Sequence, residues 1–260
     1  MDEFFANLDT EAGQEKAITT LYVAVLGRSP DPDGRDFWKG QLAEADDKDA
    51  ALKSIAESFR LNAANDPENP YNQDATAVLD AGGVDDVSDA EVTAFVNQLM
   101  QNAVGRNFDA DSDPDFPSQI TEALGDDDGA SIGDAIVSII ESAEGGDNTA
   151  LSNRVAAGEA FADAASGSSA DVADIVNEAN SLNDSVDANT ADPASEGSIA
   201  ADNIPDSSDG DDSGDGSGGS GGDTGDTQTL SASDADSTVD ASGADTTFTV
   251  ESGNYSVDVE

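Results

Sequence analysis

LYVAVLGRSPDPDGRDFW, residues 21–38, contains the end of one helix, a turn and the start of a second helix. Apolar residues run at helical spacing from Ile18 to Leu26, and Gly27 is a natural helix stop because glycine adopts a positive φ without a steric penalty. The turn is indicated by three residues that interrupt helices, Pro30, Pro32 and Gly34. Phe37, Trp38 and Leu42 then return to helical spacing.

The polar residues of this segment also have predicted structural roles. We expect Arg28 to pair with Asp31 or Asp36 and so to clamp the turn. Asp31 or Asp33 is expected to cap the second helix, because a carboxylate is favoured at a helix N-terminus. Tyr22, together with Phe37 and Trp38, would supply the largest side chains of a small core.

Further helices are predicted along the first two thirds of the chain. Their apolar faces fall around residues 51–59, 92–103, 132–140, 151–162 and 172–182. Ser88 and Glu91 have the spacing of a capping box at the start of one of them. The sequence therefore predicts a mainly α protein whose helical domain, residues 1–188, is an N-terminal bundle of short helices.

Two parts of this domain are similar in sequence. Leu26-Gly27-Arg28 is followed by two aspartates at alternate positions, and so is Val104-Gly105-Arg106. We therefore expect two diverged repeats, residues 14–65 and 88–145, followed by a helical pair at 147–186. Chance similarity in a chain rich in alanine and aspartate is the alternative.

The composition changes near Asn189. Asp206–Asp226 is almost entirely Asp, Gly and Ser, so residues 189–227 are predicted to be a flexible acidic linker. Residues 228–260 are predicted to be a short β-strand segment, because Phe248–Val250 and Tyr255–Val259 alternate in polarity around a turn at 252–254. Such strands could add to the sheet edge of a partner.

The formal net charge of −48 restricts the partners of the protein. All nine basic residues lie between Lys16 and Arg154. A chain of this charge repels phosphates and anionic lipid, which argues against a nucleic-acid partner. It stays soluble in high salt, so we expect a halophilic or calcium-rich setting; an acidic tail on an ordinary domain is the alternative. No run of about 18 apolar residues exists to span a membrane.

The sequence contains no recognisable catalytic machinery. Histidine and cysteine are both absent, which removes the usual general base, disulfides and thiolate metal sites. There is no Gly-x-Ser-x-Gly elbow and no glycine-rich phosphate loop followed by lysine. We therefore expect a protein that is not an enzyme.

Aspartates at alternate positions in turns are candidate calcium ligands, because a hard cation takes oxygen ligands from such loops. The candidates are Asp31, Asp33, Asp36, Asp109, Asp111, Asp113, Asp126 and Asp128. None of these groups has the full spacing of an EF-hand loop, and Pro114 interrupts the second. The alternative is that they cap helices or face solvent in turns.

The pattern LY-x-x-x-LGR-x-x-D-x-x-G-x-x-x-W-x-x-x-L, matched by Leu21 to Leu42, resembles a widespread helical domain of unknown function found in large bacterial exported proteins. The resemblance covers residues 14–62. That domain is common in surface-layer-like and RTX-type proteins, which implies export by a type I route without a cleaved N-terminal signal peptide. Asn153-Arg154-Val155 with Phe161-Ala162 is similar to an element that often follows it.

Together these features predict a secreted or cell-surface structural protein that self-assembles as a homo-oligomer or polymer, such as a surface layer (S-layer) or extracellular filament. One alternative is a calcium-dependent adhesin or lipopolysaccharide-anchoring module, which would bind cell-surface polysaccharide through divalent cations. A second is a scaffold like the phycobilisome linkers, which carry a loosely similar signature but tend to be basic. Calcium is the one cofactor that the sequence suggests.

Overall fold

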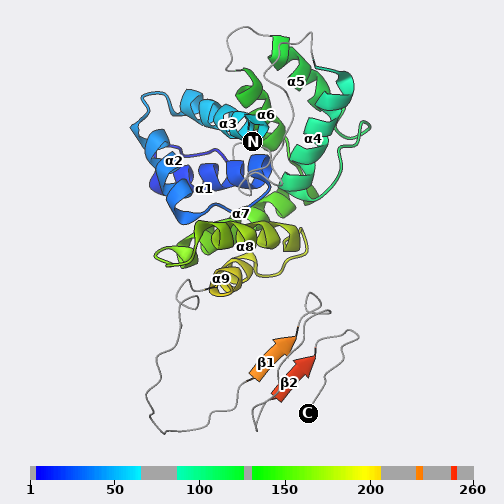
Figure 1. Ribbon diagram of the computed structural model, residues 1–260. Helices are drawn as coiled ribbons and strands as arrows, with labels where there is room; N and C mark the ends of the chain where they lie inside the picture. The colour runs from blue at the N-terminus through cyan, green and yellow to red at the C-terminus, as the bar shows by residue number, and fades with distance from the viewer. Residues whose placement is uncertain (1–3, 66–86, 126–130, 206–226, 231–246, 251–260) are drawn as a thin grey trace. The chain divides into compact units, whose positions relative to one another are not determined.

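The computed structural model describes residues 4–65, 87–125, 131–205, 227–230 and 247–250 (Figure 1). The chain divides into two compact units, Met1–Asp211 and Asp212–Glu260, and each is described by itself. The first unit is helical in its described residues, which confirms the predicted mainly α class. No helix in the described ranges is long and apolar enough to cross a membrane.

The first unit contains nine α-helices in its described residues. They are α1 (Glu11–Leu21), α2 (Pro32–Glu44), α3 (Lys48–Asn65), α4 (Asp89–Val104), α5 (Phe116–Gly125), α6 (Ser131–Glu141), α7 (Gly146–Ala165), α8 (Val172–Ser185) and α9 (Pro193–Asp202). A π-helix, Tyr22–Leu26, continues α1 directly. The capping box predicted at the start of α4 is present: the Ser88 hydroxyl accepts from the Glu91 N–H, and the Glu91 carboxylate accepts from the Ser88 N–H.

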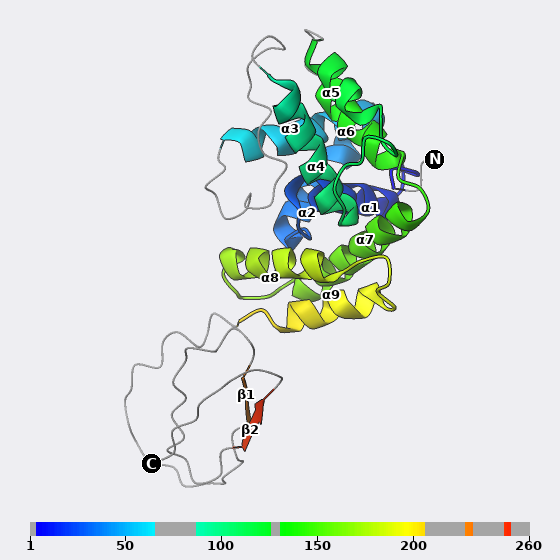
Figure 2. The same cartoon turned by 90° about the vertical axis from the view of Figure 1, so that its right-hand side faces the viewer.

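One apolar core joins α1 through α6 and the first half of α7. α3 packs against α6, and α4 packs against the π-helix, so that α1–α3 and α4–α6 share their buried faces. The largest fully buried side chains in this core are Ile18, Leu21, Leu42, Phe95, Leu99, Ile120, Ile136 and Leu151. A second, smaller core lies among α7, α8 and α9. Figures 1 and 2 both show α7 between the two groups of helices.

The position of α9 corrects the predicted start of the linker. Residues 189–227 were expected to be flexible, but Pro193–Asp202 is a helix with Asp192 at its N-cap. A Cβ on Gly197 would meet the backbone carbonyl of Ala157 in α7, so the two helices approach closely through small residues. Alanine, glycine and serine give the same composition to a linker and to a tightly packed helix, which is why composition alone misplaced this boundary.

α1–α3 and α4–α6 share an order of elements. In each, a long helix ends at a glycine of positive φ, Gly27 (70°) or Gly105 (74°), and an arginine follows. A turn then leads to two further helices. The first helix ends in a π-helix and α4 does not. This common order agrees with the expected duplication, which stays a prediction.

The second unit contains two described strands. β1 (Thr227–Leu230) and β2 (Thr247–Val250) pair in parallel, with Thr227 opposite Thr247 and Leu230 opposite Val250. β2 includes the predicted strand Phe248–Val250. The predicted strand Tyr255–Val259 and its turn lie outside the described residues, as do Asp126 and Asp128.

Candidate functional site

The first candidate site is the turn between the π-helix and α2. Nη1 and Nη2 of Arg28 both donate to Oδ2 of Asp31, at 3.3 Å. The other oxygen of Asp31, Oδ1, accepts from the backbone N–H of Gly34 at 2.7 Å. Asp31 is thus the N-cap of α2 and the partner of Arg28 at once; the sequence had offered Asp33 as an alternative cap and Asp36 as an alternative partner. The turn is closed by contacts within itself.

The ring of Tyr22 packs against the Arg28 side chain of this turn. The guanidinium carbon of Arg28 lies 4.9 Å from the centre of the Tyr22 ring, which is a cation–π distance. The Tyr22 ring also meets Phe59 edge-on, with centroids 4.9 Å apart. Burial, followed by the negative charge of Asp31, raises the pKa of the Tyr22 hydroxyl far above its usual range, with Arg28 opposing. Tyr22 therefore stays protonated at physiological pH and does not act as a base.

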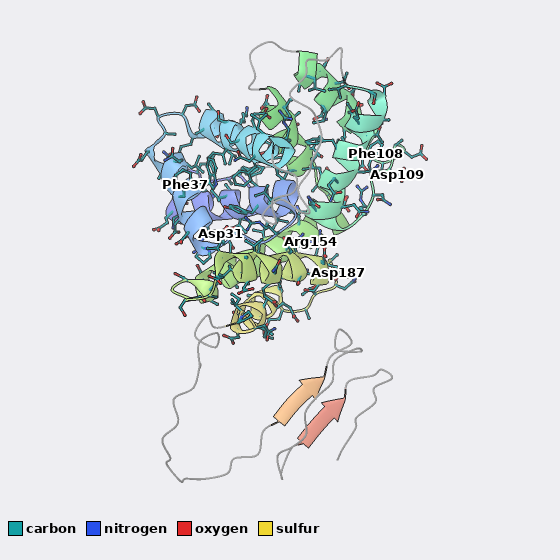
Figure 3. The ribbon with its side chains drawn as sticks, in the orientation of Figure 1. Asp31, Phe37, Phe108, Asp109, Arg154 and Asp187 are labelled. Carbon is teal, nitrogen blue, oxygen red and sulfur yellow. The ribbon has the colours of Figure 1, made fainter. Side chains whose placement is uncertain are left out.

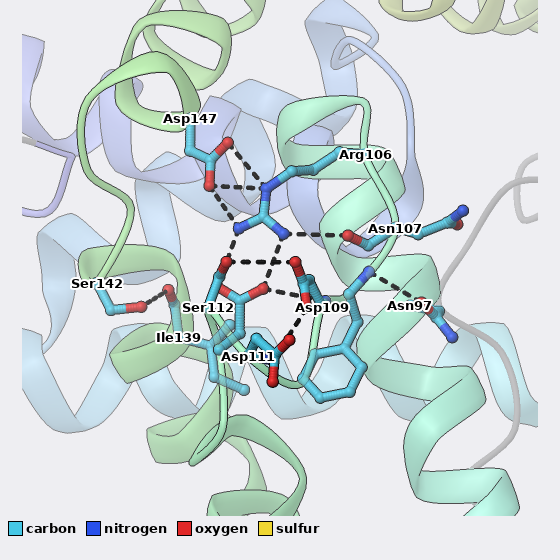
Figure 4. Close-up of polar contacts among 11 residues, drawn as sticks. Asn97, Arg106, Asn107, Asp109, Asp111, Ser112, Ile139, Ser142 and Asp147 are labelled. Atoms are coloured by element: carbon cyan, nitrogen blue, oxygen red, sulfur yellow. Dashed lines mark hydrogen bonds and ion pairs between the residues drawn. The ribbon is translucent and has the colours of Figure 1, made fainter.

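The second candidate site is the turn after α4, where Arg106 binds two carboxylates (Figure 4). Nη1 and Nη2 of Arg106 donate to the two oxygens of Asp113, at 2.7 and 2.9 Å. Nη2 and Nε donate to Asp147 at the start of α7, at 2.6 and 2.9 Å. The remaining Nη1 hydrogen goes to the carbonyl of Asn107. All five N–H groups of this arginine are therefore used.

The aspartates of this second turn also form hydrogen bonds with one another's backbone. Oδ1 of Asp109 accepts from the backbone N–H of Asp111 at 2.9 Å, and Oδ2 of Asp113 accepts from the N–H of Asp109 at 3.2 Å. The Asp113 residue is buried, with an exposed fraction of 7%. Hydrogen bonding to Arg106 holds the pKa of the Asp113 carboxyl below its usual range. Asp113 was predicted to bind calcium. In the structure the guanidinium of Arg106 supplies the positive charge beside its carboxylate.

The candidate calcium ligands are divided among several roles. Asp31 and Asp113 pair with arginines, whereas Asp33 is exposed in the first turn of α2. Asp36 forms ion pairs with Lys39 at 3.3 Å and with Arg35 at 3.9 Å. Among the residues that the structure describes, no group of three or more acidic side chains is placed to hold a metal ion. Calcium binding stays a prediction.

Arg154, in α7, is a key residue to which the sequence assigned no role. Its side chain is buried, and its Nε donates to the carbonyl of Val186 at 2.9 Å. Its Nη1 donates to two carbonyls in the last turn of α4, Gln101 at 2.9 Å and Asn102 at 2.5 Å. Burial lowers the pKa of this guanidinium, with Asp184 and Asp187 opposing. Arg154 joins the C-terminal ends of α4 and α8, where a cation is favoured.

The neighbouring residue extends this connection. Nδ2 of Asn153 donates to the carbonyls of Asp187 at 2.7 Å and Thr190 at 3.4 Å, in the segment between α8 and α9. Figure 3 shows Arg154 and Asp187 on the same side of the helical unit. The short Asn153-Arg154-Val155 element therefore connects α7 to the C-terminal ends of α4 and α8 and to the segment between α8 and α9. Its similarity to a recurring element was the one signal in the sequence that could have pointed to it.

A hollow lies beside Arg106. It is open to solvent and lined by polar side chains, Asn107, Asp109, Ser112, Asp113, Glu144 and Asp147 among them. An adjoining apolar cavity of about 20 Å³ between α4 and α6 has room for about one water molecule. The guanidinium in the hollow has no hydrogen left to offer a ligand. The arrangement stabilises the turn and holds no pair of groups suited to general acid–base chemistry.

The Arg106–Asp113 pair makes a testable prediction about acid stability. The folded-state pKa of Asp113 is below its unfolded value, so its contribution is present above that unfolded value and is lost as pH falls through the lowered pKa. We expect Asp113→Asn to lower the free energy of unfolding by about 1–2 kcal/mol at about pH 7. The difference from the wild type should shrink below about pH 4.

Urea unfolding at fixed ionic strength across this pH range measures the effect. Asp111→Asn is the matched control, because Asp111 is exposed in the same turn. Both substitutions remove one negative charge, so a general change in net charge affects them equally. An equal loss of stability in both variants would contradict the assigned role of Asp113.

Comparison with known families identifies part of the chain. Residues 1–62 match the family described as Domain of unknown function (DUF4214). The match covers about a quarter of the 260 residues and contains the first turn, whereas Arg106 and Arg154 lie outside it. No curated protein and no solved structure matches the chain. The predicted resemblance to a domain of unknown function is thus confirmed for this segment, and its exported setting stays a prediction.

Proposed function

We propose that the protein is an acidic structural protein that assembles with copies of itself outside the cell, as a surface layer or filament, in salt-rich or calcium-rich surroundings. The observation that supports this proposal most directly is that every basic side chain contacts a group of its own chain. All nine contact groups of the same chain, so the excess of acidic side chains gives the surface its charge.

Most of the nine basic residues form ion pairs. Arg35 meets Asp163 at 2.8 Å, Lys39 meets Glu15 at 2.8 Å, Lys53 meets Asp134 at 2.5 Å and Arg60 meets Glu57 at 2.6 Å, in addition to the pairs of Arg28 and Arg106. The other three use different partners. Lys48 and Arg154 donate to backbone carbonyls, and the Lys16 ammonium lies 5.3 Å from the centre of the Phe4 ring.

This distribution of charge makes contact between copies depend on ions. Fifty-seven acidic residues face nine basic ones, so two copies repel each other at low ionic strength. At about 1 M salt the screening length falls to about 3 Å, and the repulsion is then confined to groups in contact. Divalent cations could also bridge carboxylates of two copies, since oxygen ligands suit calcium.

The contacts in the matched domain favour a framework over a catalyst. Tyr22, Arg28, Asp31 and Gly34, which belong to the sequence pattern, form a connected set in the first turn: Arg28 contacts Tyr22 and Asp31, and Gly34 lies against Asp31 and Tyr22. Both carboxylate oxygens of Asp31 are engaged within the turn, one by Arg28 and one by the Gly34 N–H. This arrangement supports a role in which the domain supplies shape and surface.

Electron microscopy of the purified full chain tests the proposal. We expect dispersed particles at about 20 mM NaCl, and sheets, filaments or regular oligomers at about 2 M NaCl or after addition of about 10 mM calcium. Magnesium at the same concentration separates simple screening from a preference for calcium. Dispersed monomers under every condition would refute self-assembly.

The same samples distinguish the adhesin alternative. Calorimetry would detect calcium that binds stoichiometrically to the monomer. Calcium binding without assembly, together with retention on immobilised lipopolysaccharide, would favour the adhesin or anchoring module. Assembly without retention on lipopolysaccharide supports the structural role.

A further inference from the structure

The α8–α9 pair, defined as residues 166–205, differs from the rest of the helical unit in its charge. It contains eight acidic residues and no basic one, because the last basic residue of the chain is Arg154. Figures 1 and 2 both show the two helices at one end of the helical unit. Six of the acidic residues are exposed and two are partly buried, Asp171, Asp184, Asp187, Asp192, Glu196 and Asp202 in the first group and Asp174 and Glu178 in the second. The negative charge of the pair is therefore not offset by any residue within it.

The apolar core that holds the pair against α7 is separate from the main core of the unit. It consists of Ala157, Phe161, Ala165, Ile175, Ala179, Leu182, Val186 and Ala200. Four of these eight residues are alanines, and an alanine buries much less apolar surface than a leucine or a phenylalanine. The main core is larger and contains fully buried side chains such as Phe95, Leu99 and Ile136. Apolar burial thus holds the pair less firmly than it holds α1–α6 together.

Backbone carbonyls, and not carboxylates, connect the pair to the other helices. Nε of Arg154 donates to the carbonyl of Val186, and the N–H of Ser29 donates to the carbonyl of Ala179 at 3.3 Å. In the part of the chain that the structure describes, no carboxylate of the pair forms an ion pair with a basic side chain. Ion pairs therefore contribute nothing to the docking of the pair, whereas the repulsion among its own carboxylates remains.

We propose that docking of the α8–α9 pair depends on ionic strength: the pair is packed against α7 in concentrated salt and detaches in dilute salt, while α1–α6 stay folded. The screening length is about 30 Å at about 10 mM salt, so the eight carboxylates repel one another across the whole pair. At about 1 M salt the screening length falls to about 3 Å, and the small core then suffices. The inference concerns a single copy and does not rest on the proposed self-assembly.

Individual carboxylates of the pair oppose its packing to different degrees. Glu178 of α8 and Glu196 of α9 line the same recess between the two helices, so their like charges face a common space. Asp202 lies in the last turn of α9, where the negative end of the helix dipole disfavours a carboxylate. Asp184, by contrast, is attracted by the charge of Arg154. Neutral side chains at positions 178 and 202 should therefore favour docking at low ionic strength.

Detachment gives the helical unit a second state. It uncovers the face of α7 that carries Ala157, Phe161 and Ala165, of which Phe161 is fully buried in the docked state. The main core does not include this face, so α1–α6 can keep their packing. A weakly held part of a protein opens with a free energy of its own, below that of global unfolding. The pair thus acts as a salt-sensitive element that covers an apolar surface when the salt concentration is high.

Hydrogen exchange of the full chain, read by mass spectrometry of its peptides, tests the inference at about 10 mM and about 1 M NaCl and constant pH. We expect the amides of α8 and α9 to exchange about tenfold or more faster at the lower salt concentration, and those of α4 and α6 to change by less than about threefold. An equal acceleration in all four helices would mean that dilute salt destabilises the whole unit, and it would overturn the inference.

Two matched double variants separate the charge of the pair from the net charge of the chain. Glu178→Gln with Asp202→Asn removes two carboxylates from the pair and should slow the exchange of α8 and α9 at about 10 mM NaCl by about threefold or more. Asp111→Asn with Glu122→Gln removes two carboxylates from exposed positions outside the pair and should have a much smaller effect on α8 and α9. Equal effects of the two double variants would contradict the inference.

The protein concentration distinguishes this inference from the proposed self-assembly. Docking within one copy gives the same exchange rates at every protein concentration. Protection of α8 and α9 at about 1 M NaCl that is lost on dilution of the protein would come from contacts between copies. That result would support self-assembly and overturn salt-dependent docking. Salt-dependent exchange in a protein that stays dispersed by microscopy would support docking even though the proposed function fails.

Discussion

Arg154→Ala is expected to lower the free energy of unfolding by about 3–4 kcal/mol, the largest loss among the substitutions considered. The substitution removes a buried side chain and leaves a void among α4, α7 and α8. It also deprives the carbonyl of Val186 of its donor, and it leaves Asn102 with a long bond of 3.4 Å from Asn183. Urea unfolding at about pH 7, in enough salt to keep the chain compact, measures the change.

A lysine that makes the same kind of hydrogen bond but is only partly buried provides the control. Lys48 donates to the carbonyls of Ala43 and Ala45 at 3.2 and 3.1 Å, near the end of α2. Water can replace those bonds, so Lys48→Ala should cost less than about 1 kcal/mol. Arg154→Lys keeps the charge but cannot reach all three carbonyls and should lie between the two. Equal effects of Arg154→Ala and Lys48→Ala would contradict the assigned role.

The sequence could predict the features that depend on neighbouring residues. The helix stop at Gly27, the capping box at Ser88 and the two roles for which Asp31 was one of two candidates all involve partners within a few positions. Such contacts are encoded by spacing, because a capping side chain has the N–H groups two or three residues later within its reach. The corresponding predictions are confirmed.

Contacts between distant residues were not predictable in the same way. Arg154 meets carbonyls of Gln101 and Val186, 53 and 32 positions away, and any residue type offers a carbonyl. Asp113 looked like a calcium ligand because its turn is acidic, whereas Arg106 had no expected partner among so many acids. Only the fold shows which acid lies within reach, here Asp113 and Asp147.

Gly34→Ala is expected to lower the free energy of unfolding by about 2–3 kcal/mol. Gly34 lies in the first turn of α2, where a Cβ would meet the hydroxyl of Tyr22 and would lie 2.8 and 2.9 Å from the two carboxylate oxygens of Asp31. Neither neighbour can move freely, because Tyr22 is buried against Phe59 and Asp31 is held by Arg28. Thermal unfolding of the two proteins measures the loss.

Gly40→Ala, in the same helix, is the matched control for Gly34→Ala. It makes the same chemical change where nothing lies within 4 Å, so it should stabilise the helix by about 0.5–1 kcal/mol. Because the two substitutions are expected to change the stability in opposite directions, the comparison separates the effect of close contact from that of helix propensity. Destabilisation by both substitutions would show that the effect is not specific to the turn.

A double-mutant cycle decides whether the glycine is required by the turn. Tyr22→Phe removes the hydroxyl that the new methyl group would meet, so in that background Gly34→Ala should cost about 1 kcal/mol less than in the wild type. Part of the penalty should remain, because the Asp31 carboxylate still lies within 3 Å of the Cβ position. Additive effects would mean that Tyr22 and Gly34 are independent. Coupling would show that the Tyr22 hydroxyl and the backbone of Gly34 act together in fixing the start of α2 against the core.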